Sequence, residues 1–451
     1  MNENQLAVIV LAAGEGTRMR SARPKVLHEV CGVPMAAHVL NAARTLSPAR
    51  IVVVIGHGAD AVQAALAAPD IRFAIQEGRL GTADAVASAR DAVGDAAQVL
   101  VLNGDEPLVT GETLARLLAS ADRQLMAFTT QSVADGGSLG RVLRDTRGAV
   151  QSIVQAADLE RPGGPAEVNW GQYLFDAEWL WESLPLIPVS PKGEYYLTKL
   201  ADFAYEASRP AATIPLDDAE ALGLDDRVKL AEAERRMRAR ITHRHLLAGV
   251  TIRDPNTTYI DAAVELGQDV TILPGCHLLG ASTVAPNTVI GPGTTLRSSS
   301  VGEGCTIQSS VIEDSRIGNR VSVGPYAHVR GGATIGDDCY LGNYAEVKNS
   351  VLGRAVKMHH FSYIGDADVG DEANIAAGVI TCNFDGVNKN RTTIGARAFV
   401  GCDTMLVAPV TVGDAALTGA GSVVNRDVPP GARVAGVPAR PLSPPGEETG
   451  R

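Results

Sequence analysis

The apolar residues of the chain follow two different patterns, one before about residue 226 and one after about residue 250. In the first part, short apolar runs such as LAVIVLAA (6–13), IVVVIG (51–56) and VLVLNGD (99–105) alternate with helix-like stretches such as PMAAHVLNAARTL (34–46). This alternation predicts βαβ units, and hence an α/β domain with a mostly parallel, Rossmann-like sheet that is covered on both faces. Ligands of such sheets bind at the carboxyl ends of the strands.

In the second part, aliphatic residues recur every six positions. A helix would give a shorter period and a simple strand a period of two, whereas this period is typical of hexapeptide repeats, in which three short strands form each coil of a parallel β-helix. The pattern resembles the left-handed hexapeptide family, so left-handed coiling is expected against the general preference for right-handed crossovers. The period is carried by Leu266, Ile272, Leu278, Val284, Ile290 and Leu296, by Ile317, Val323, Val329, Ile335, Leu341 and Val347, and later by Met358, Ile364, Ile394, Val400, Leu406 and Val412.

Composition changes mark the boundaries between these parts. The charged stretch DRVKLAEAERRMRARITHRHLLAG (226–249) has no Pro and no Gly before its last residue, so it predicts a connecting helix, although an amphipathic helix packed on either domain fits equally well. The polar run TCNFDGVNKNRTT (381–393) interrupts the repeat and predicts a protruding loop. The predicted organisation is a first domain at 1–226, a linker helix at 227–247, a β-helix domain at 248–438 and a disordered Pro- and Glu-rich tail at 439–451.

Length and charge restrict the possible partners. A chain of 451 residues with a net charge of −11 predicts at least two domains, and it argues against nucleic acid or a membrane surface as a general partner. The six cysteines form no CxxC pair, which favours reduced thiols and a cytoplasmic location. The chain starts without a basic segment before its first apolar run, and no apolar run approaches the roughly 20 residues of a membrane span.

The stretch LAAGEGTRMRSARPK (11–25) follows the first predicted strand. Its small residues let backbone N–H groups approach phosphates, and Arg18 and Lys25 add positive charge. It is not a P-loop, because no Gly-Lys-Ser/Thr follows, and it lacks a clean GxGxxG, which disfavours a dinucleotide. Further along, GDEPL (104–108) places Asp105 at a strand end, where a lone Asp is most often a cap or turn residue. As a whole, the first stretch resembles the opening of sugar-nucleotide pyrophosphorylases, in which Asp105 would be a Mg²⁺ ligand.

The order of domains, together with LGT (80–82), GR (140–141), VN (168–169) and KGEYYLT (192–198), resembles one family over about residues 5–440. This is the family of bifunctional N-acetylglucosamine-1-phosphate uridyltransferases and glucosamine-1-phosphate acetyltransferases. The resemblance implies that Mg²⁺ binds Asp105 and Asp225, and that a sugar-1-phosphate oxygen attacks the α-phosphorus of UTP while pyrophosphate leaves. The implied nucleotide and sugar site consists of Leu11, Ala12, Ala13, Gly14, Arg18, Lys25, Gln76, Gly81, Thr82, Asn103, Gly104, Asp105, Gly140, Gln155, Asn169 and Asp225.

Several positions depart from the family pattern. Gln155 stands where the family has a Glu that contacts the sugar, Asp225 stands for an Asn, Asn103 stands for a Tyr, and GTADA (81–85) replaces Gly-Thr-Gly-His-Ala. These departures motivate an alternative, a nucleotidyltransferase for another sugar-1-phosphate whose β-helix serves only for trimer assembly. A non-enzymatic scaffold is a third hypothesis, which the retained Arg18, Lys25 and acidic residues disfavour.

The same resemblance implies an acetyltransferase site in the β-helix. His360 lies three residues before Tyr363, which is the spacing of the family's catalytic base, and Glu346 would support its charge. Neither histidine holds an inward position of the repeat, which disfavours a buried core histidine. His359 takes the position that Gly often fills beside the coil and is expected to be a structural neighbour. The acetyl group would come from acetyl-CoA, and a homotrimer is expected, because such sites usually form between neighbouring β-helices. The implied contacts are Arg330, Lys348, Tyr363 and Asn374 for the sugar phosphate, and Ala377, Asn383, Phe384, Cys402, Ala420 and Arg440 for acetyl-CoA.

Overall fold

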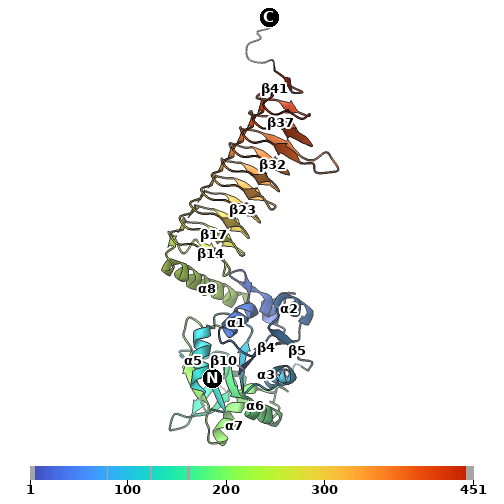
Figure 1. The fold of residues 1–451 in the computed structure, drawn as a ribbon. Helices are drawn as coiled ribbons and strands as arrows, with labels where there is room; N and C mark the ends of the chain where they lie inside the picture. Colours follow the sequence, from blue (N-terminus) through green and yellow to red (C-terminus); the bar gives the residue numbers. More distant parts are fainter. Residues whose placement is uncertain (1–5, 79, 122–123, 160–162, 443–451) are drawn as a thin grey trace, which may run out of the picture. The chain divides into compact units, whose positions relative to one another are not determined.

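The computed structural model describes residues 6–78, 80–121, 124–159 and 163–442 (Figure 1). The chain divides into two compact units, Met1–Met237 and Arg238–Arg451. The boundary falls inside one long helix, α8 (Arg227–Leu247), whose bounds are those of the predicted linker. In the described ranges, no helix is both long enough and apolar enough to cross a membrane.

The first unit is built on a sheet of nine strands. Seven have the order β11-β7-β10-β6-β1-β4-β5, β8 pairs with β10, and β9 pairs with β8. The pairs β1–β4, β1–β6, β4–β5 and β7–β11 are parallel, whereas β10 is antiparallel to its neighbours β6 and β7. The strands are β1 (Leu6–Leu11), β4 (Arg50–Ile55), β5 (Ile71–Ile75), β6 (Gln98–Asn103), β7 (Met126–Val133), β8 (Arg141–Arg144), β9 (Val150–Val154), β10 (Ala166–Asp176) and β11 (Ala212–Pro215).

Helices cover both faces of this sheet, as the sequence predicts. Alternate residues of β1 enter two different apolar cores: Ile9 packs in the core under α3, α4, α6 and α7, and Val8 packs in the core under α1, α2 and α5. The helices are α1 (Met35–Arg44), α2 (Ala59–Leu66), α3 (Thr82–Ser88), α4 (Arg90–Val93), α5 (Gly111–Ser120), α6 (Ala177–Ser183) and α7 (Leu200–Glu206). The carboxyl ends of β1 and β6 lie side by side, with Leu11 opposite Asn103, and stay open for a ligand.

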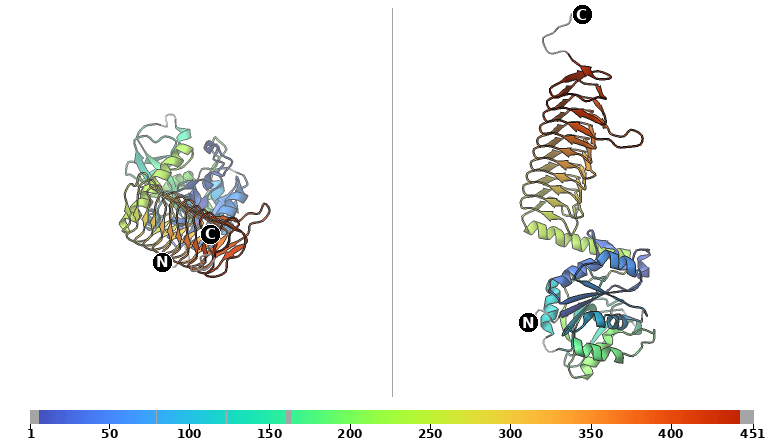
Figure 2. Two further views of the ribbon diagram at one scale, coloured as in Figure 1. Left: turned by 90° about the horizontal axis from the view of Figure 1, so that it is seen from above. Right: turned by 45° about the vertical axis from the view of Figure 1, so that its right-hand side comes forward.

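The second unit is a parallel β-helix with three sheets (Figures 1 and 2). The first sheet runs from β12 (Thr251–Ile252) to β42 (Arg440–Pro441), the second from β13 (Tyr259–Ile260) to β40 (Val423–Val424), and the third from β14 (Glu265–Leu266) to β38 (Val410–Val412). Up to β41, successive strands of each sheet come from successive coils and pair in parallel, so the predicted inward residues stack in ladders such as Ile272, Ile290 and Ile307. The predicted fold class is confirmed for both units.

The ladders also explain why the six-residue period slips after Leu296. Leu296 stacks on Ile312, and Val301 stacks on Ile317, so these coils are shorter than three full hexapeptides. The stacking continues through the change, because the missing residues are taken from the corners between strands.

The predicted disordered tail begins too early. Residues Arg440–Pro441 form β42, which pairs antiparallel with β41 (Arg433–Ala435), and the N–H of Leu442 donates to the carbonyl of Arg433 at 2.8 Å. The physical reason is the free edge that β41 offers at the end of the first sheet, which a short extended segment can pair with despite its proline. The rest of the predicted tail, 443–451, lies outside the described residues.

Candidate functional site

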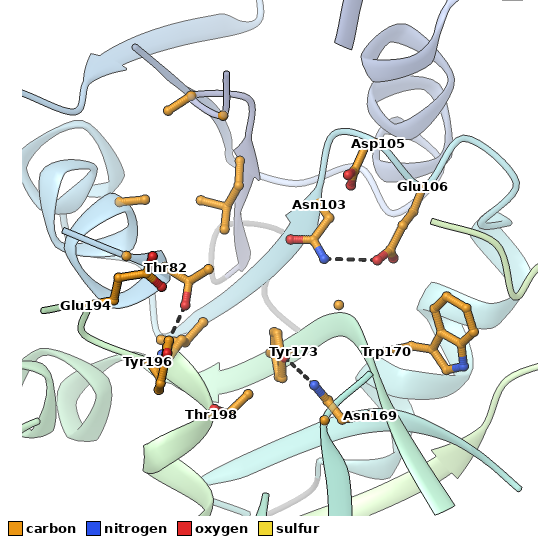
Figure 3. A pocket seen from close by; sticks show the side chains of 18 of the residues that line it. Thr82, Asn103, Asp105, Glu106, Asn169, Trp170, Tyr173, Glu194, Tyr196 and Thr198 are labelled. Atoms are coloured by element: carbon orange, nitrogen blue, oxygen red, sulfur yellow. Dashed lines mark hydrogen bonds between the residues drawn. The ribbon is translucent and has the colours of Figure 1, made fainter. Parts of the chain in front are cut away.

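A cavity of about 710 Å³ opens at the carboxyl ends of β1 and β6 in the first unit (Figure 3). Of the predicted nucleotide and sugar residues, Arg18, Gly104 and Asp225 do not line it. Gly104 instead donates its N–H to the carbonyl of Leu11 at 2.9 Å, and an added Cβ would crowd that same oxygen. The predicted residues that line the cavity are Leu11, Ala12, Ala13, Gly14, Lys25, Gln76, Gly81, Thr82, Asn103, Asp105, Gly140, Gln155 and Asn169.

Two carboxylates beside the cavity are held by cations. Lys25 pairs with Asp105, and Asp225 lies 2.5 Å from Arg18 and 2.9 Å from Lys229. The N–H of the residue before Asp225 donates to the Asp105 carbonyl at 3.0 Å, which brings the two acidic segments together. Burial by itself would raise the pKa of Asp225, but the hydrogen bond and charge of Lys229, with the charges of Arg18 and Lys25, lower it below its ordinary value.

This pair of carboxylates fits a Mg²⁺ ion. In the described part of the chain, no group of three or more His, Cys, Asp and Glu side chains could hold a metal by itself. Mg²⁺, however, is typically bound through one or two carboxylates together with substrate phosphates and water. One oxygen of Asp225, Oδ1, is buried and faces the Lys229 ammonium at 2.9 Å, so it already lies in a cation's position and could bind a metal ion in place of that ammonium.

A buried polar network that the sequence did not indicate lies behind Asp105. Asn103 donates to Glu106 Oε1 at 2.9 Å (Figure 3). Gln172 donates to the other Glu106 oxygen. Burial, together with the charge of Asp105, raises the pKa of Glu106 to about 8 against the opposing effect of the Asn103 hydrogen bond. Gly171 is required here, since a Cβ would lie 1.6 Å from Asn103 Nδ2.

Two hydrogen-bonded side-chain amides, Asn169 and Gln155, line one part of the cavity. Asn169 donates to the hydroxyl of Tyr173 at 2.6 Å, and its buried Oδ1 has no hydrogen-bond partner among the described residues. Gln155 donates to Thr198 at 2.8 Å. The stretch KGEYYLT that carried part of the resemblance contributes four lining residues that had no predicted role. The lining residues that sequence reasoning missed are Glu15, Val26, Ala85, Glu106, Ser138, Leu139, Trp170, Gly171, Tyr173, Glu194, Tyr196, Leu197 and Thr198.

In the second unit, one edge of the β-helix gathers four predicted residues. The edge lies between the first and second sheets, and each of its corner carbonyls accepts a backbone N–H from the next coil. The carbonyl of His360 accepts from Gly378 at 3.2 Å, that of Ala377 from Asp403 at 2.8 Å, and that of Cys402 from Gly421 at 2.8 Å. His360, Ala377, Cys402 and Ala420 therefore occupy the same position of successive coils.

The partner of His360 differs from the expected one. Glu346 does not support the histidine; Glu346 Oε1 instead accepts from Arg330 at 2.6 and 2.9 Å. His360 Nδ1 is hydrogen-bonded at 2.6 Å to Oδ1 of Asn343, which holds the same edge position one coil earlier. The correction has a geometric reason, because Glu346 belongs to strand β28 (Glu346–Lys348) of the second sheet, whereas His360 lies on the corner before β31 (Tyr363–Gly365).

The second sheet brings the predicted phosphate and sugar residues together next to this edge. Arg330, on β25 (His328–Arg330), lies directly beside Lys348, and Glu346 lies beside Tyr363. The neighbouring ammonium of Lys348 lowers the pKa of Lys389, which places a third cation close to this face.

Amides and a carboxylate complete this face. Asp366 accepts from Asn349 at 2.6 Å and from Asn383 at 2.5 Å, and Asn383 also lies 3.4 Å from the Tyr363 hydroxyl. Of these, Asn349 and Asp366 had no predicted role. Each lies one coil from a partner, so the coil spacing is the signal that could have found them.

Three predicted residues lie apart from this face. Asn374 is on β33 (Asn374–Ile375) of the first sheet, beside Lys357. Phe384 is exposed in the loop that follows β34 (Ile380–Cys382), and this loop protrudes from the coil as predicted (Figure 2). Arg440 is exposed on β42.

Comparison with known proteins gives matches in both units. The model of the MobA-like NTP transferase domain matches residues 8–162, and that of the bacterial transferase hexapeptide, with six repeats, matches residues 314–349. The chain is 44% identical over 435 residues to the "Bifunctional protein GlmU" of Streptomyces coelicolor, covering 94% of this chain and 90% of that protein. Proteins of the same name from Brevibacillus brevis and Paraburkholderia phytofirmans are each 43% identical, over 432 and 425 residues, covering 94% and 93% of this chain and 94% of each relative.

Proposed function

The chain belongs to the bifunctional GlmU family, and on that premise we propose which of its residues carry the two reactions. The enzyme acetylates glucosamine-1-phosphate with acetyl-CoA, and it transfers UMP from UTP to N-acetylglucosamine-1-phosphate with release of pyrophosphate. The observation that carries the assignment is the separation of two polar clusters, one in the cavity of the first unit and one along an edge of the β-helix.

In the uridyltransferase reaction, the small residues at 12–14 and the cations Arg18 and Lys25 bind the phosphates of UTP, and Gln76, Gly81 and Thr82 bind its uracil base. Gly140, Gln155 and Asn169 hold the sugar, whose phosphate oxygen attacks the α-phosphorus in line with the leaving pyrophosphate. These groups lower the barrier by fixing the two reactants and by stabilising charge on the phosphate oxygens. Asp105 and Asp225 would hold a Mg²⁺ ion, which supplies further neutralisation of that charge.

In the acetyltransferase reaction, His360 is the general base. Its Nδ1–H donates to Asn343 Oδ1, which leaves the lone pair of Nε2 free to take a proton from the substrate amine. The deprotonated amine then attacks the thioester carbonyl of acetyl-CoA, and coenzyme A leaves as the thiol. No acyl-enzyme is required, so Cys402 acts as a contact residue.

The remaining residues of the β-helix bind the two substrates. Arg330 and Lys348 lie next to each other and bind the phosphate of glucosamine-1-phosphate, while Glu346 keeps Arg330 in place. Tyr363 and Asn374 orient the sugar. Acetyl-CoA lies along the edge at Ala377, Cys402 and Ala420, with further contacts from Asn383, Phe384 and Arg440.

We further propose a homotrimer in the cytoplasm. Exposed aromatic rings at corners of successive coils, such as the stacked pair Tyr326 and Tyr344, offer apolar surface to a second β-helix. A reducing compartment suits six thiols, four of which are buried. Sedimentation at micromolar protein concentration tests the assembly, and a monomer would contradict it.

Product analysis of matched variants tests the assignment of residues. His360→Ala should abolish acetyl transfer and leave uridylyl transfer intact, and Asp105→Ala should do the reverse. His359→Ala is the control, because its ring contacts Tyr340 and His360 but makes no hydrogen bond within the described residues. Loss of acetyl transfer in the His359 variant with retention in the His360 variant would refute the choice of base. Offering several sugar-1-phosphates in the same assay tests whether Gln155 has altered the sugar preference.

A further inference from the structure

The side-chain amide of Gln76 is fixed by two acceptors. Its Nε2 donates to the Gly81 carbonyl at 3.1 Å and to Asp84 Oδ2 at 2.8 Å. Both partners are oxygens that can only accept, so a flipped amide would place Oε1 against two other oxygens. The orientation of this amide is therefore determined, and Oε1 has no hydrogen-bond partner among the described residues.

The two acceptors are held in place independently of Gln76. Gly81 has a φ of 106°, and an added Cβ would lie 2.6 Å from the carbonyl oxygen of Tyr195, so its backbone is packed where only glycine fits. The Asp84 carboxylate also accepts the N–H of Leu80 at 3.2 Å, which fixes it at the start of α3. Gln76 is 8% exposed and lines the cavity, so Oε1 is the polar atom that it can offer to a ligand.

An amide that presents only an acceptor distinguishes between pyrimidine bases. Uracil has one donor on its pairing edge, N3–H, flanked by two carbonyl oxygens. Cytosine has an unprotonated N3 at the same place, so a base held in the same pose would bring a lone pair against Gln76 Oε1. A buried site built to bond a particular donor discriminates strongly against an analogue that lacks it.

We propose that Asp84 is a positioning residue for base selectivity: it holds the Gln76 amide in the orientation that accepts from N3–H of uracil and rejects cytosine. The proposal rests on the role of Gln76 at the base, which is part of the proposed function. Asp84 does not line the cavity itself, so it acts on the base through the Gln76 amide and not by direct contact.

The ratio of kcat/KM for UTP to that for CTP, measured in the uridyltransferase reaction, tests the proposal. Asp84→Ala removes one acceptor and lets the amide turn, so the ratio should fall about tenfold or more, which corresponds to one hydrogen bond to a charged group. Asp84→Asn should keep the ratio close to that of the unmodified enzyme, because its Oδ1 can still accept from Gln76. Both substrates are measured on the same protein, so partial unfolding of a variant cancels in the ratio.

Two further variants separate the possible failures. Asp91→Ala removes an exposed carboxylate from α4, close to Asp84 in sequence, and should leave the ratio unchanged. Gln76→Met removes the amide. If the Met variant loses selectivity while Asp84→Ala keeps it, Gln76 reads the base without help and the inference about Asp84 is wrong. If the Met variant keeps full selectivity, the role of Gln76 in the proposed function is wrong and the inference falls with it.

Discussion

Replacing Glu106 by Gln should stabilise the first unit at and above neutral pH and should have little effect in acid. Burial raises the pKa of Glu106 to about 8 in the folded protein, whereas in the unfolded chain this carboxyl has its ordinary value of roughly 4.3. Between these two values the folded state keeps a proton that the unfolded state has released. The stability that this proton contributes is therefore fully present below the pKa of the unfolded chain and is lost as the pH rises toward the pKa of the folded protein. A glutamine carries no such proton.

The size of the effect follows from the shift. Each pH unit between the two values costs about 1.4 kcal/mol of unfolding free energy, so the upper limit is about 5 kcal/mol. Because the charge of Asp105 contributes to this shift, part of the difference depends on that neighbour. We expect a stabilisation of about 2 kcal/mol or more at pH 8 and close to none at pH 4.5.

The replacement fits the network without leaving a buried group unpaired. Gln172 donates to Glu106 with its amide nitrogen, and its amide oxygen accepts from the hydroxyl of Thr129 at 2.5 Å. If the Gln172 amide turns over, it can accept from a glutamine at 106 and donate to Thr129, because a hydroxyl both donates and accepts.

Tryptophan fluorescence during urea unfolding is the suitable assay. The chain has three tryptophans, Trp170, Trp179 and Trp181, and all three lie in the first unit, so the signal does not mix the two units. Unfolding is measured from pH 4.5 to pH 9 with a chelator present, and Glu206→Gln, an exposed carboxylate at the end of α7, is the matched control. A difference between Glu106→Gln and the unmodified enzyme that stays constant across this range would refute the reasoning.

Other predictions concern the histidine, the cavity and the coil. Asn343→Ala should lower kcat for acetyl transfer about tenfold without affecting uridylyl transfer, and Asn343→Asp should move the acidic limb of the pH–rate profile upward, because a carboxylate raises the pKa of the base. Gly171→Ala should reduce kcat/KM for UTP about tenfold or more with an unchanged circular dichroism spectrum, because the new Cβ displaces Asn103. Leu341 is fully buried in a ladder, so Leu341→Ala should lower the unfolding free energy of the second unit by about 2–5 kcal/mol. Thermal inactivation measured for both activities on the same sample should then show that acetyl transfer is lost at a lower temperature than uridylyl transfer.

The sequence was sufficient to predict the two folds, because both depend on local periodicity. In each pattern, the spacing of apolar residues along the chain shows which side chains face a core, and no knowledge of residues distant in sequence is needed. The strand at Arg440–Pro441 was missed for the opposite reason: its pairing depends on the free edge of β41, which no local pattern reports.

The candidate sites were predicted less evenly. Among residues carried by motifs, Gly14, Lys25 and Asp105 line the cavity, whereas Arg18 and Gly104 of the same motifs do not. Glu106 was missed, since an acidic residue next to Asp105 gives no sign that it is buried. The partner of His360 was misassigned because contacts across coils join residues about 17 positions apart, and the choice between Asn343 and Glu346 depends on which corner or strand each one occupies.

The edge that carries His360 has equivalent positions at a regular spacing. Neighbouring strands of a sheet lie about 4.8 Å apart, so the positions of Asn343, His360, Ala377, Cys402 and Ala420 mark steps of that length over about 19 Å. The loop after β34 inserts extra residues between Ala377 and Cys402 in sequence, yet the two remain one step apart in space. Substitutions along the edge, such as the cysteine at 402, can therefore change what a bound molecule touches while leaving the spacing intact. Removal of a whole coil would instead shorten the edge by one strand spacing of about 4.8 Å.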